Sequence, residues 1–424
     1  MVFLRYIVER VIFLTNKDRE RLRYLANHQL EVANSPKNLE RVELWKKHNM
    51  YKGERPMIHV EVDSFAHEAI NPKLQCEDVD ARAIEYKLIH SFVGLEDVDD
   101  DRVVPPYFQQ TYDIYFTLFG QHIKQTVVRK EDGTEMGHHF EHIIDDLGDN
   151  FDKIMQPSVF GVNKESTLQK NEIYNDIFGD ILPVKLVSNG LYSTPTQHVV
   201  HMMGMENMLY SMYDYPDEFK QMMDRIAEDY IAYFKKLESE NVLLQNNSFE
   251  WICQGSMGFY DEPEIKGQVK TTDLWGFMDS QETVGISPEM FREFIFPCYH
   301  KIASVFGRLN YGCCEPVNTF WDDIKTLPNL KKVSISPWCD EDFMAEQLRG
   351  SGIIYHRKPN PTFLGVGAKL DEDAFRKHIE KTIKTARGCK LEICQRDVYT
   401  VNNDMDKVRR FVEIIRETIE TYWE

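Results

Sequence analysis

The chain has 424 residues, 42% of them hydrophobic, and a formal net charge of −19. This length suits one large α/β barrel with insertions, and the hydrophobic fraction allows a sizeable core. The negative charge argues against a nucleic-acid partner, because phosphate binding needs clustered Lys and Arg. No apolar run reaches the roughly 18 residues of a transmembrane helix, so we expect no membrane span.

The chain start and the cysteines predict a cytoplasmic protein. Met1 to Leu14 is apolar but interrupted by charged residues, and it lacks the small-residue cleavage site of a signal peptide. It predicts a helix, or else reflects the choice of start site. The eight cysteines are spread through the chain, which is typical of reduced thiols rather than of a disulfide framework.

The N-terminal part reads as a helical extension, residues 1–55, ahead of the first strand. Residues 18–47 are charged with helical periodicity, and the break at Asn34-Ser35-Pro36 predicts two helices. Further along, residues 105–150 differ from the rest of the chain. A strand-like run followed by the turn signal at 131–134 predicts a β-hairpin insertion there.

Three histidines, His138, His139 and His142, follow the predicted hairpin. Two of them have the i, i+4 spacing that could bind a metal on a helix. They lie far from the other predicted strands, however, so we expect them to be solvated or to belong to a lid over a substrate.

Apolar, β-rich runs recur through the chain, mostly separated by helical patterns. The runs are residues 58–62, 182–188, 242–245, 274–278, 307–311, 332–336, 353–356 and 391–394. Eight strands alternating with helices predict a (β/α)₈ TIM barrel. No linker, low-complexity run or short repeat divides the chain, so we expect one domain over residues 1–424.

In such a barrel the functional site lies at the carboxyl ends of the strands. The run 307–311 is followed by Cys313, Cys314 and Glu315, and the last run ends in Cys394. Because side chains alternate along a strand, we expect at most one of the two adjacent thiols to point into a given site. The resulting hypothesis is a metal held where these two strand ends meet.

Other side chains near the predicted strand ends are candidates for the chemistry. Glu282 and Glu315 could act as acids or complete a ligand set, and His356 is expected to face the mouth of the barrel. The aromatic residues near the strand ends suit a flat or amphipathic substrate. The candidates for substrate contact are Asn246, Tyr311 and Trp338. The chain contains no phosphate-binding glycine loop and no Gly-x-Ser-x-Gly elbow.

Three stretches resemble the uroporphyrinogen decarboxylase family. Residues 204–230 resemble its helix pair that opens with Gly-x-Glu, residues 285–297 its Ser-Pro-x-x-Phe segment followed by Pro, and Asn360-Pro361 its Asn-x-x-Pro turn. The likeness runs from about residue 180 to the end. It implies a (β/α)₈ barrel, in agreement with the strand count.

Within that family the chain resembles the methyltransferases more than the decarboxylases. The decarboxylases carry a paired-Arg motif near the first strand, and residues 58–65 contain no Arg. The zinc-dependent methyltransferases that serve corrinoid proteins, such as the methylcobamide:coenzyme M enzymes, use a His-x-Cys after one strand and a lone Cys after the last. Cys313 and Cys394 match these cysteines, and Tyr311 stands at the His position.

The resemblance implies zinc on Cys313 or Cys314 together with Cys394, a small methylated donor, and a corrinoid protein as partner. Thiolate ligands agree with zinc. The corrinoid would be supplied by the partner, because this chain has no Asp-x-His-x-x-Gly signature. Tyr311 in place of the His points away from a thiol substrate and towards an aryl methyl ether.

Two other functions stay open. One is decarboxylation of a small, less anionic substrate on the same barrel, which would proceed without metal in the manner of the family's decarboxylases. The other is a non-catalytic scaffold that partners a corrinoid protein.

Overall fold

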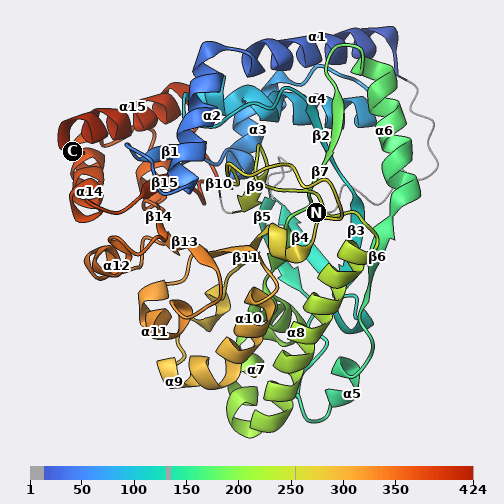
Figure 1. The fold of residues 1–424 in the computed structure, drawn as a ribbon. Helices are drawn as coiled ribbons and strands as arrows, with labels where there is room; N and C mark the ends of the chain where they lie inside the picture. The colour runs from blue at the N-terminus through green and yellow to red at the C-terminus, as the bar shows by residue number, and fades with distance from the viewer. Residues whose placement is uncertain (1–13, 130–134, 254, 424) are drawn as a thin grey trace.

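The computed structural model describes residues 14–129, 135–253 and 255–423 (Figure 1). The expected helix at the chain start, apart from Leu14, and the expected turn at 131–134 lie outside these ranges.

A sheet of seven parallel strands forms the centre of the molecule. In spatial order the strands are β1 (Met57–Val60), β15 (Leu391–Gln395), β14 (Ile354–Arg357), β13 (Leu330–Ile335), β12 (Arg308–Tyr311), β11 (Trp275–Met278) and β8 (Leu191–Ser193). Every pairing in this sheet is parallel. The carboxyl ends of the strands therefore lie at one edge, which is where the α/β architecture predicts a site.

Two of the expected barrel strands are not in this sheet. The run 182–188 contains β7 (Val184–Val187), which pairs with β2 (Phe108–Thr111) instead. Residues 242–245 are described and form no strand. Six expected strands are confirmed, and β8, which the sequence pattern missed, is the seventh.

The described pairings leave the sheet open between β1 and β8. At the edge of β1, the carboxylates of Asp101 and Asp100 accept hydrogen bonds from the backbone N–H groups of Ile58 and Val60. Side chains therefore satisfy the edge groups that a further strand would pair with. The predicted α/β fold with a central parallel sheet is confirmed, but the described residues show seven strands and do not confirm closure into an eight-stranded barrel.

Helices cover the sheet and form the outer layer. The predicted break at residues 34–36 is confirmed, because α1 ends at Ala33 and Ser35 caps α2. The longer helices are α1 (Asn16–Ala33), α2 (Pro36–Asn49), α4 (Val79–Val93), α6 (Lys164–Phe178), α7 (Pro195–Asp214), α8 (Pro216–Ser239), α10 (Phe296–Ala303), α12 (Glu341–Leu348), α14 (Glu372–Thr385) and α15 (Met405–Tyr422). The short ones are α3 (Ala66–Ala69), α5 (Phe151–Ile154), α9 (Pro288–Met290), α11 (Trp321–Ile324) and α13 (Thr362–Gly365). Within the described ranges no helix is both long and apolar enough to cross a membrane.

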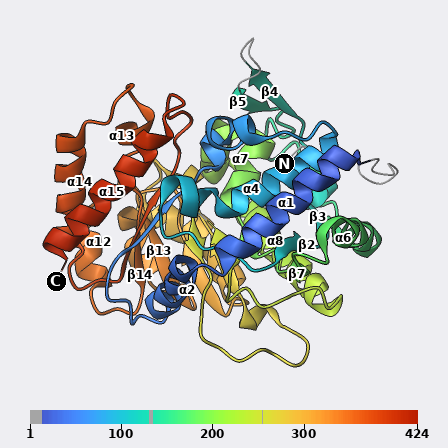
Figure 2. The ribbon, with the colours of Figure 1, turned by 90° about the horizontal axis from the view of Figure 1, so that it is seen from above.

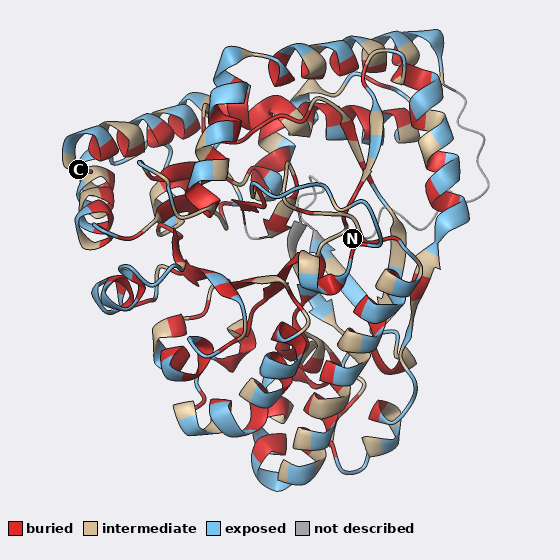
Figure 3. Ribbon diagram, in the orientation of Figure 1, coloured by how far each residue is buried: buried red, intermediate tan, exposed pale blue. Residues whose placement is uncertain are grey.

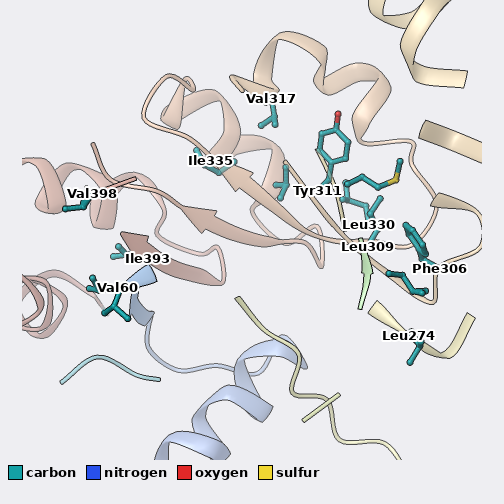
Figure 4. Packing of buried hydrophobic residues seen from close by; sticks show 14 of the residues in the cluster. Val60, Leu274, Phe306, Leu309, Tyr311, Val317, Leu330, Ile335, Ile393 and Val398 are labelled. Carbon is teal, nitrogen blue, oxygen red and sulfur yellow. The ribbon is translucent and has the colours of Figure 1, made fainter. Parts of the chain in front are cut away.

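The central strands are buried on both faces. Every residue of β1, β11, β14 and β15 is buried, as expected for a parallel sheet covered by helices (Figure 3). Figure 2 shows α14 and α15 on one side of β13 and β14, and α1 and α4 on the other. Leu309 and Tyr311 of β12 belong to the hydrophobic cluster together with Phe306 and Leu330 (Figure 4).

The predicted hairpin insertion is present. β4 (Gln125–Arg129) and β5 (Glu135–Phe140) pair antiparallel, and β3 (Asp113–Thr117) pairs antiparallel with β6 (Val159–Asn163) beside them. His138 and His139 lie within β5, facing Val127 and Thr126, and do not follow the hairpin as expected. A second hairpin, β9 (Trp251–Cys253) with β10 (Ser256–Met257), reaches the central sheet.

Candidate functional site at the carboxyl edge of the sheet

The two thiols that follow β12 converge on one point. The Sγ atoms of Cys313 and Cys314 lie 3.5 Å apart. The expectation that at most one of them points into a given site is therefore wrong. Side chains alternate only while the backbone stays extended, and here β12 ends at Tyr311 and Gly312 has φ +96°. Glycine adopts this left-handed conformation without strain, so Gly312 sets the direction of both thiols.

The two thiols differ in acidity. The hydrogen bond with Cys314, together with burial, raises the pKa of Cys313, whereas the hydrogen bond from Cys313 lowers the pKa of Cys314. Lys358 favours the thiolate form of both. Cys314 is therefore the readier thiolate, and the thiolate is the form that attacks electrophiles and binds metals. Its Sγ also lies 3.4 Å from Asp397 Oδ2.

Two buried or nearly buried cations flank the thiols. Arg396 Nη1 lies 3.5 Å from Cys313 Sγ, and the guanidinium is paired with Glu61 after β1. Lys358 Nζ, after β14, donates to the backbone carbonyl of Cys313 at 2.9 Å. Burial lowers the pKa of Arg396, but Glu61, Cys313 and Cys394 outweigh it and raise the pKa overall. Cys313, after β12, and Cys394, on β15, thus both influence the charge of this guanidinium electrostatically.

Cys394 lies on β15 beside His59 of β1, its partner in the strand register. The turn of the β9–β10 hairpin covers both residues. A Cβ atom on Gly255 would lie 2.2 Å from Cys394 Sγ and 2.9 Å from His59 Cδ2. Cys394 and His59 thus both lie directly beneath Gly255 of the hairpin turn.

His59 is a site residue that the sequence interpretation missed. Its Nδ1 lies 3.0 Å from Asp100 Oδ2, and its ring packs on Trp251 with centroids 4.7 Å apart. Metal-binding histidines commonly present their other ring nitrogen to a carboxylate in this way. The signal that could have revealed it is the one polar residue in the apolar strand Met57–Val60.

Replacing Gly255 with Ala is expected to lower the free energy of unfolding by about 1–3 kcal/mol. The new Cβ would overlap Cys394 Sγ, and Gly255 has φ +81°, a conformation that alanine rarely adopts. Urea denaturation measures the change. Gly267→Ala is the matched control, because a Cβ there meets no atom within 4 Å. Equal stability of the two variants would show that the hairpin does not press on Cys394.

A cleft of about 290 Å³ opens beside the thiols. Arg396 and Glu61 form its polar side, and Tyr192, Trp251 and Phe277 contribute aromatic walls. The rings of Tyr192 and Phe277 lie 4.8 Å apart. A cleft with charged groups on one side and aromatic side chains on another can orient a small molecule, and the aromatic walls suit a flat ligand.

Asp279, directly after β11, is a second residue that was not among the predicted site residues. It has 0% exposed surface, and neither carboxylate oxygen has a hydrogen-bond partner among the described residues. Burial, followed by the negative charges of Glu315, Cys313 and Glu282, raises the pKa of Asp279 well above its ordinary value. This environment favours the neutral carboxylic acid, which can donate a proton.

Neither of the two predicted carboxylates lines the cleft, and neither do the three thiols or Asp279. Glu315 accepts hydrogen bonds from the backbone N–H groups of Ser280 at 2.9 Å and Cys313 at 2.8 Å. It therefore joins the end of β11 to the thiol loop. Glu282 accepts a hydrogen bond from Thr196 Oγ1 at 2.8 Å, and burial raises its pKa.

Tyr311 and His356 do not face the mouth as expected. Tyr311 packs against Tyr299 of α10 in the hydrophobic layer outside the sheet, with its Oη 2.6 Å from Ser280 Oγ. His356 has no exposed surface, and its Nδ1 lies 3.5 Å from Glu392 Oε1. Burial lowers the pKa of His356 to about 3, so it is neutral at ordinary pH.

The two remaining predicted substrate contacts are far apart. Asn246 is at the opposite end of β11, where its side chain exchanges hydrogen bonds of 2.9 Å with the backbone N–H and carbonyl of Trp275. Both ends of the amide are used, so the expectation of substrate contact is corrected to a structural role. Trp338 follows β13 and is 69% exposed at the carboxyl edge.

The described side chains do not form a ready-made metal site, although their chemistry suits zinc. Among the described residues, no three or more His, Cys, Asp or Glu side chains are arranged so that they could hold a metal ion. The donor types nevertheless match zinc, because thiolate sulfur and imidazole nitrogen are its usual ligands. The separation of the Cys313 and Cys314 sulfurs, 3.5 Å, is also close to the roughly 3.8 Å edge of a tetrahedron with Zn–S bonds near 2.3 Å.

Comparisons with known proteins add little at the level of function. No protein-family model matches the sequence, and no curated protein matches it. Among solved structures, a methyltransferase from Methanosarcina mazei is similar with a TM-score of 0.49 and 12% identity, over 89% of this chain and 98% of that chain. A likeness at this level assigns neither family nor activity.

Proposed function

We propose that this chain is a methyltransferase that passes a methyl group from a small aromatic methyl ether to the cobalt of a separate corrinoid protein, with zinc at the thiol site. The observation that carries the proposal is the close pair of thiols, Cys313 and Cys314, whose Cys313 sulfur contacts Arg396 on the wall of an aromatic-sided cleft.

The donors proposed for zinc are Cys394, His59, and one or both of Cys313 and Cys314. Bound zinc would supply Lewis acidity toward the ether oxygen. Because no three-ligand group is arranged among the described residues, the proposal requires these side chains to draw together when the metal binds. Asp100 would orient His59 through Nδ1.

The chain's other residues have roles that follow from their positions. The aromatic walls of the cleft would hold the ring of the donor and exclude water. The electron pair of the methyl–oxygen bond would stay on the oxygen, which then needs a proton, while the reduced cobalt of the partner, Co(I), would supply the pair for the new methyl–cobalt bond. Asp279, a buried acid directly after β11 that does not itself line the cleft, is the proposed source of that proton, which would have to reach the oxygen as the side chains draw together.

Metal analysis of the purified protein tests the proposal. We expect about one zinc per chain in the wild type, lost in Cys394→Ala. Cys298→Ala is the matched control, because Cys298 is buried in α10 in the hydrophobic cluster and should leave the metal content unchanged. A wild-type protein that holds no metal after incubation with zinc would contradict the thiolate site.

One observation favours a second function, decarboxylation of a small carboxylate. Arg396 and Lys358 are cations at the same edge, and an acid such as Asp279 could protonate the carbanion that loss of CO₂ leaves. Zinc removal separates the two functions. Activity that survives a chelator supports decarboxylation, whereas activity that requires the metal supports methyl transfer.

A further inference from the structure

A second cavity, of about 200 Å³, adjoins Trp251. Trp251 lines both spaces, and no other residue is common to them. The second cavity is bordered by α1, α4, the segment after β1, and residues 102–109. Nothing in the proposed methyl transfer uses it.

Arg102 gives this cavity its chemical character. The side chain is only 2% exposed, and its guanidinium forms no ion pair with any carboxylate in the described part of the chain. Nη1 donates to the backbone carbonyl of His90 at 3.1 Å, and Nε has no partner among the described residues. The guanidinium lies over Trp251, 5.2 Å from the ring centroid. The charge of Arg102 acts on Asp63 and Asp100 from a longer distance than an ion pair, so a ligand anion could still pair with the guanidinium directly.

The carboxylates nearest to Arg102 are already engaged. Asp63, which also lines the cavity, accepts a hydrogen bond from His90 Nε2 at 3.0 Å when that nitrogen is protonated. Asp100 accepts from the backbone N–H groups of Val60 and Arg102 and lies 3.0 Å from His59. A second cation, Lys87, borders the same space. The lining is therefore suited to one further negative charge.

Gln29 adds a second unsatisfied group that points to the same ligand. Its Nε2 donates to the carbonyls of Pro105 and Tyr107, both at 3.0 Å, which leaves the buried Oε1 without a partner among the described residues. Oε1 can only accept a hydrogen bond. The cavity thus offers donors from Arg102, an acceptor from Gln29, and apolar walls from Phe108 and Phe249.

We propose that this cavity binds a small carboxylate that also carries a hydroxyl or amine donor, with the carboxylate on Arg102 and the donor toward Gln29. Occupancy would fix Trp251, the wall shared with the cleft, so the ligand would act on the site without entering it. The inference goes beyond the proposed function and does not depend on zinc or on methyl transfer.

Isothermal titration with glycolate as the probe tests this site, with chloride at matched ionic strength as the blank. We expect saturable binding that Arg102→Met weakens by about tenfold to a hundredfold, the loss of a charge-assisted hydrogen bond. Because the charge of Arg102 acts on the buried carboxylate of Asp100, thermal denaturation of Arg102→Met precedes the titration and establishes that the variant is folded. Should it fail to fold, Ser91→Phe fills the cavity from α4 without altering Arg102 and should also abolish binding.

Arg396→Met is the matched control, because Arg396 lines the cleft and not this cavity. It should bind glycolate as the wild type does. Binding lost in Arg396→Met and kept in Arg102→Met would place the carboxylate in the cleft and overturn the proposal. Absence of saturable binding to the wild type would overturn it as well.

Discussion

Replacing Lys332 with Met is expected to lower the free energy of unfolding by about 3–5 kcal/mol. Lys332 lies on β13 with no exposed surface, and its Nζ is 3.1 Å from Glu392 Oε2 on β15. Without the ammonium group, Glu392 would remain as a buried carboxylate deprived of its main cation. Breaking one side of a buried ion pair costs more than the pair itself contributes.

The pair belongs to a network that ties the second hairpin to the sheet. Ser256 of β10 donates to Glu392 Oε1 at 2.8 Å and accepts from Lys332 Nζ at 2.5 Å. His48 of α2 lies 3.3 Å from Glu392 Oε2, and His356 lies near the other oxygen. Loss of Lys332 therefore loosens the β9–β10 hairpin, whose turn covers Cys394.

Urea denaturation at several pH values measures this effect. Burial opposes ionisation of Glu392, but Lys332 and the nearby histidines hold its pKa below the ordinary value. A lowered carboxyl pKa stabilises the wild type above the unfolded-state pKa, about 4.3, and this contribution is lost as the pH falls. The difference between wild type and Lys332→Met should therefore shrink in acid.

Lys331→Met is the matched control, since the neighbouring Lys331 is exposed on the same strand. It should change the stability by less than about 0.5 kcal/mol. The double variant Lys332→Met with Glu392→Gln should recover part of the loss, because it removes both charges. A single variant as stable as the control would show that Glu392 does not depend on Lys332.

The strands that the sequence predicted well are those whose burial is continuous. β11, β14 and β15 are buried throughout and β12 and β13 are buried at all but one position each, and these β-rich runs alternate with helices, so their positions follow from the pattern. Residues 242–245 show its limit. Val242 and Leu243 are buried, but Gln245 and Asn246 direct their hydrogen bonds through side chains to Pro263 and Trp275. An apolar run cannot distinguish a strand from a buried extended loop fixed in this way.

The sequence predicted which residue types form the candidate site better than it predicted where their side chains point. Cys313, Cys314 and Cys394 were found because thiols at strand ends are rare. The approach of the Cys313 and Cys314 sulfurs depends on Gly312, and the cover over Cys394 depends on the hairpin turn at Gly255. Both are backbone conformations that residue patterns do not encode. The face of a strand that meets the helices depends on the register of the strand. For this reason Tyr311 was wrongly predicted to contact substrate, and His59 was not predicted as a site residue at all.

Asp279→Asn is expected to lower kcat/KM for methyl transfer by about 10²- to 10⁴-fold, the usual contribution of a general acid. The same variant should be more stable than the wild type at neutral pH. Asp279 is fully buried, its oxygens lack partners among the described residues, and three acidic groups surround it. An amide of nearly the same shape cannot acquire the charge that this environment opposes.

The stability difference between Asp279→Asn and the wild type should depend on pH in a defined direction. The pKa of Asp279 is raised in the folded state, so the folded protein binds the proton more tightly than the unfolded chain. The associated stability is fully present below the unfolded pKa, about 3.9, and is lost as the pH rises through the folded pKa. The amide that replaces the carboxyl group in the variant does not titrate. The advantage of the variant over the wild type should therefore grow with pH, by about 1.4 kcal/mol per unit of pKa shift.

Urea denaturation between acid and alkaline pH, on protein treated with a chelator, separates this effect from metal binding. Asp261→Asn is the control, because Asp261 is exposed, and its stability should follow that of the wild type at every pH. If the stability advantage of Asp279→Asn over the wild type grows with pH but the variant keeps full activity, Asp279 is not the catalytic acid. The proton for the leaving oxygen then comes from another group. If the variant loses both the activity and the pH-dependent fall in stability of the wild type, the buried acid serves catalysis at the expense of stability. Its surroundings keep it protonated, and this proton is the one that the reaction consumes.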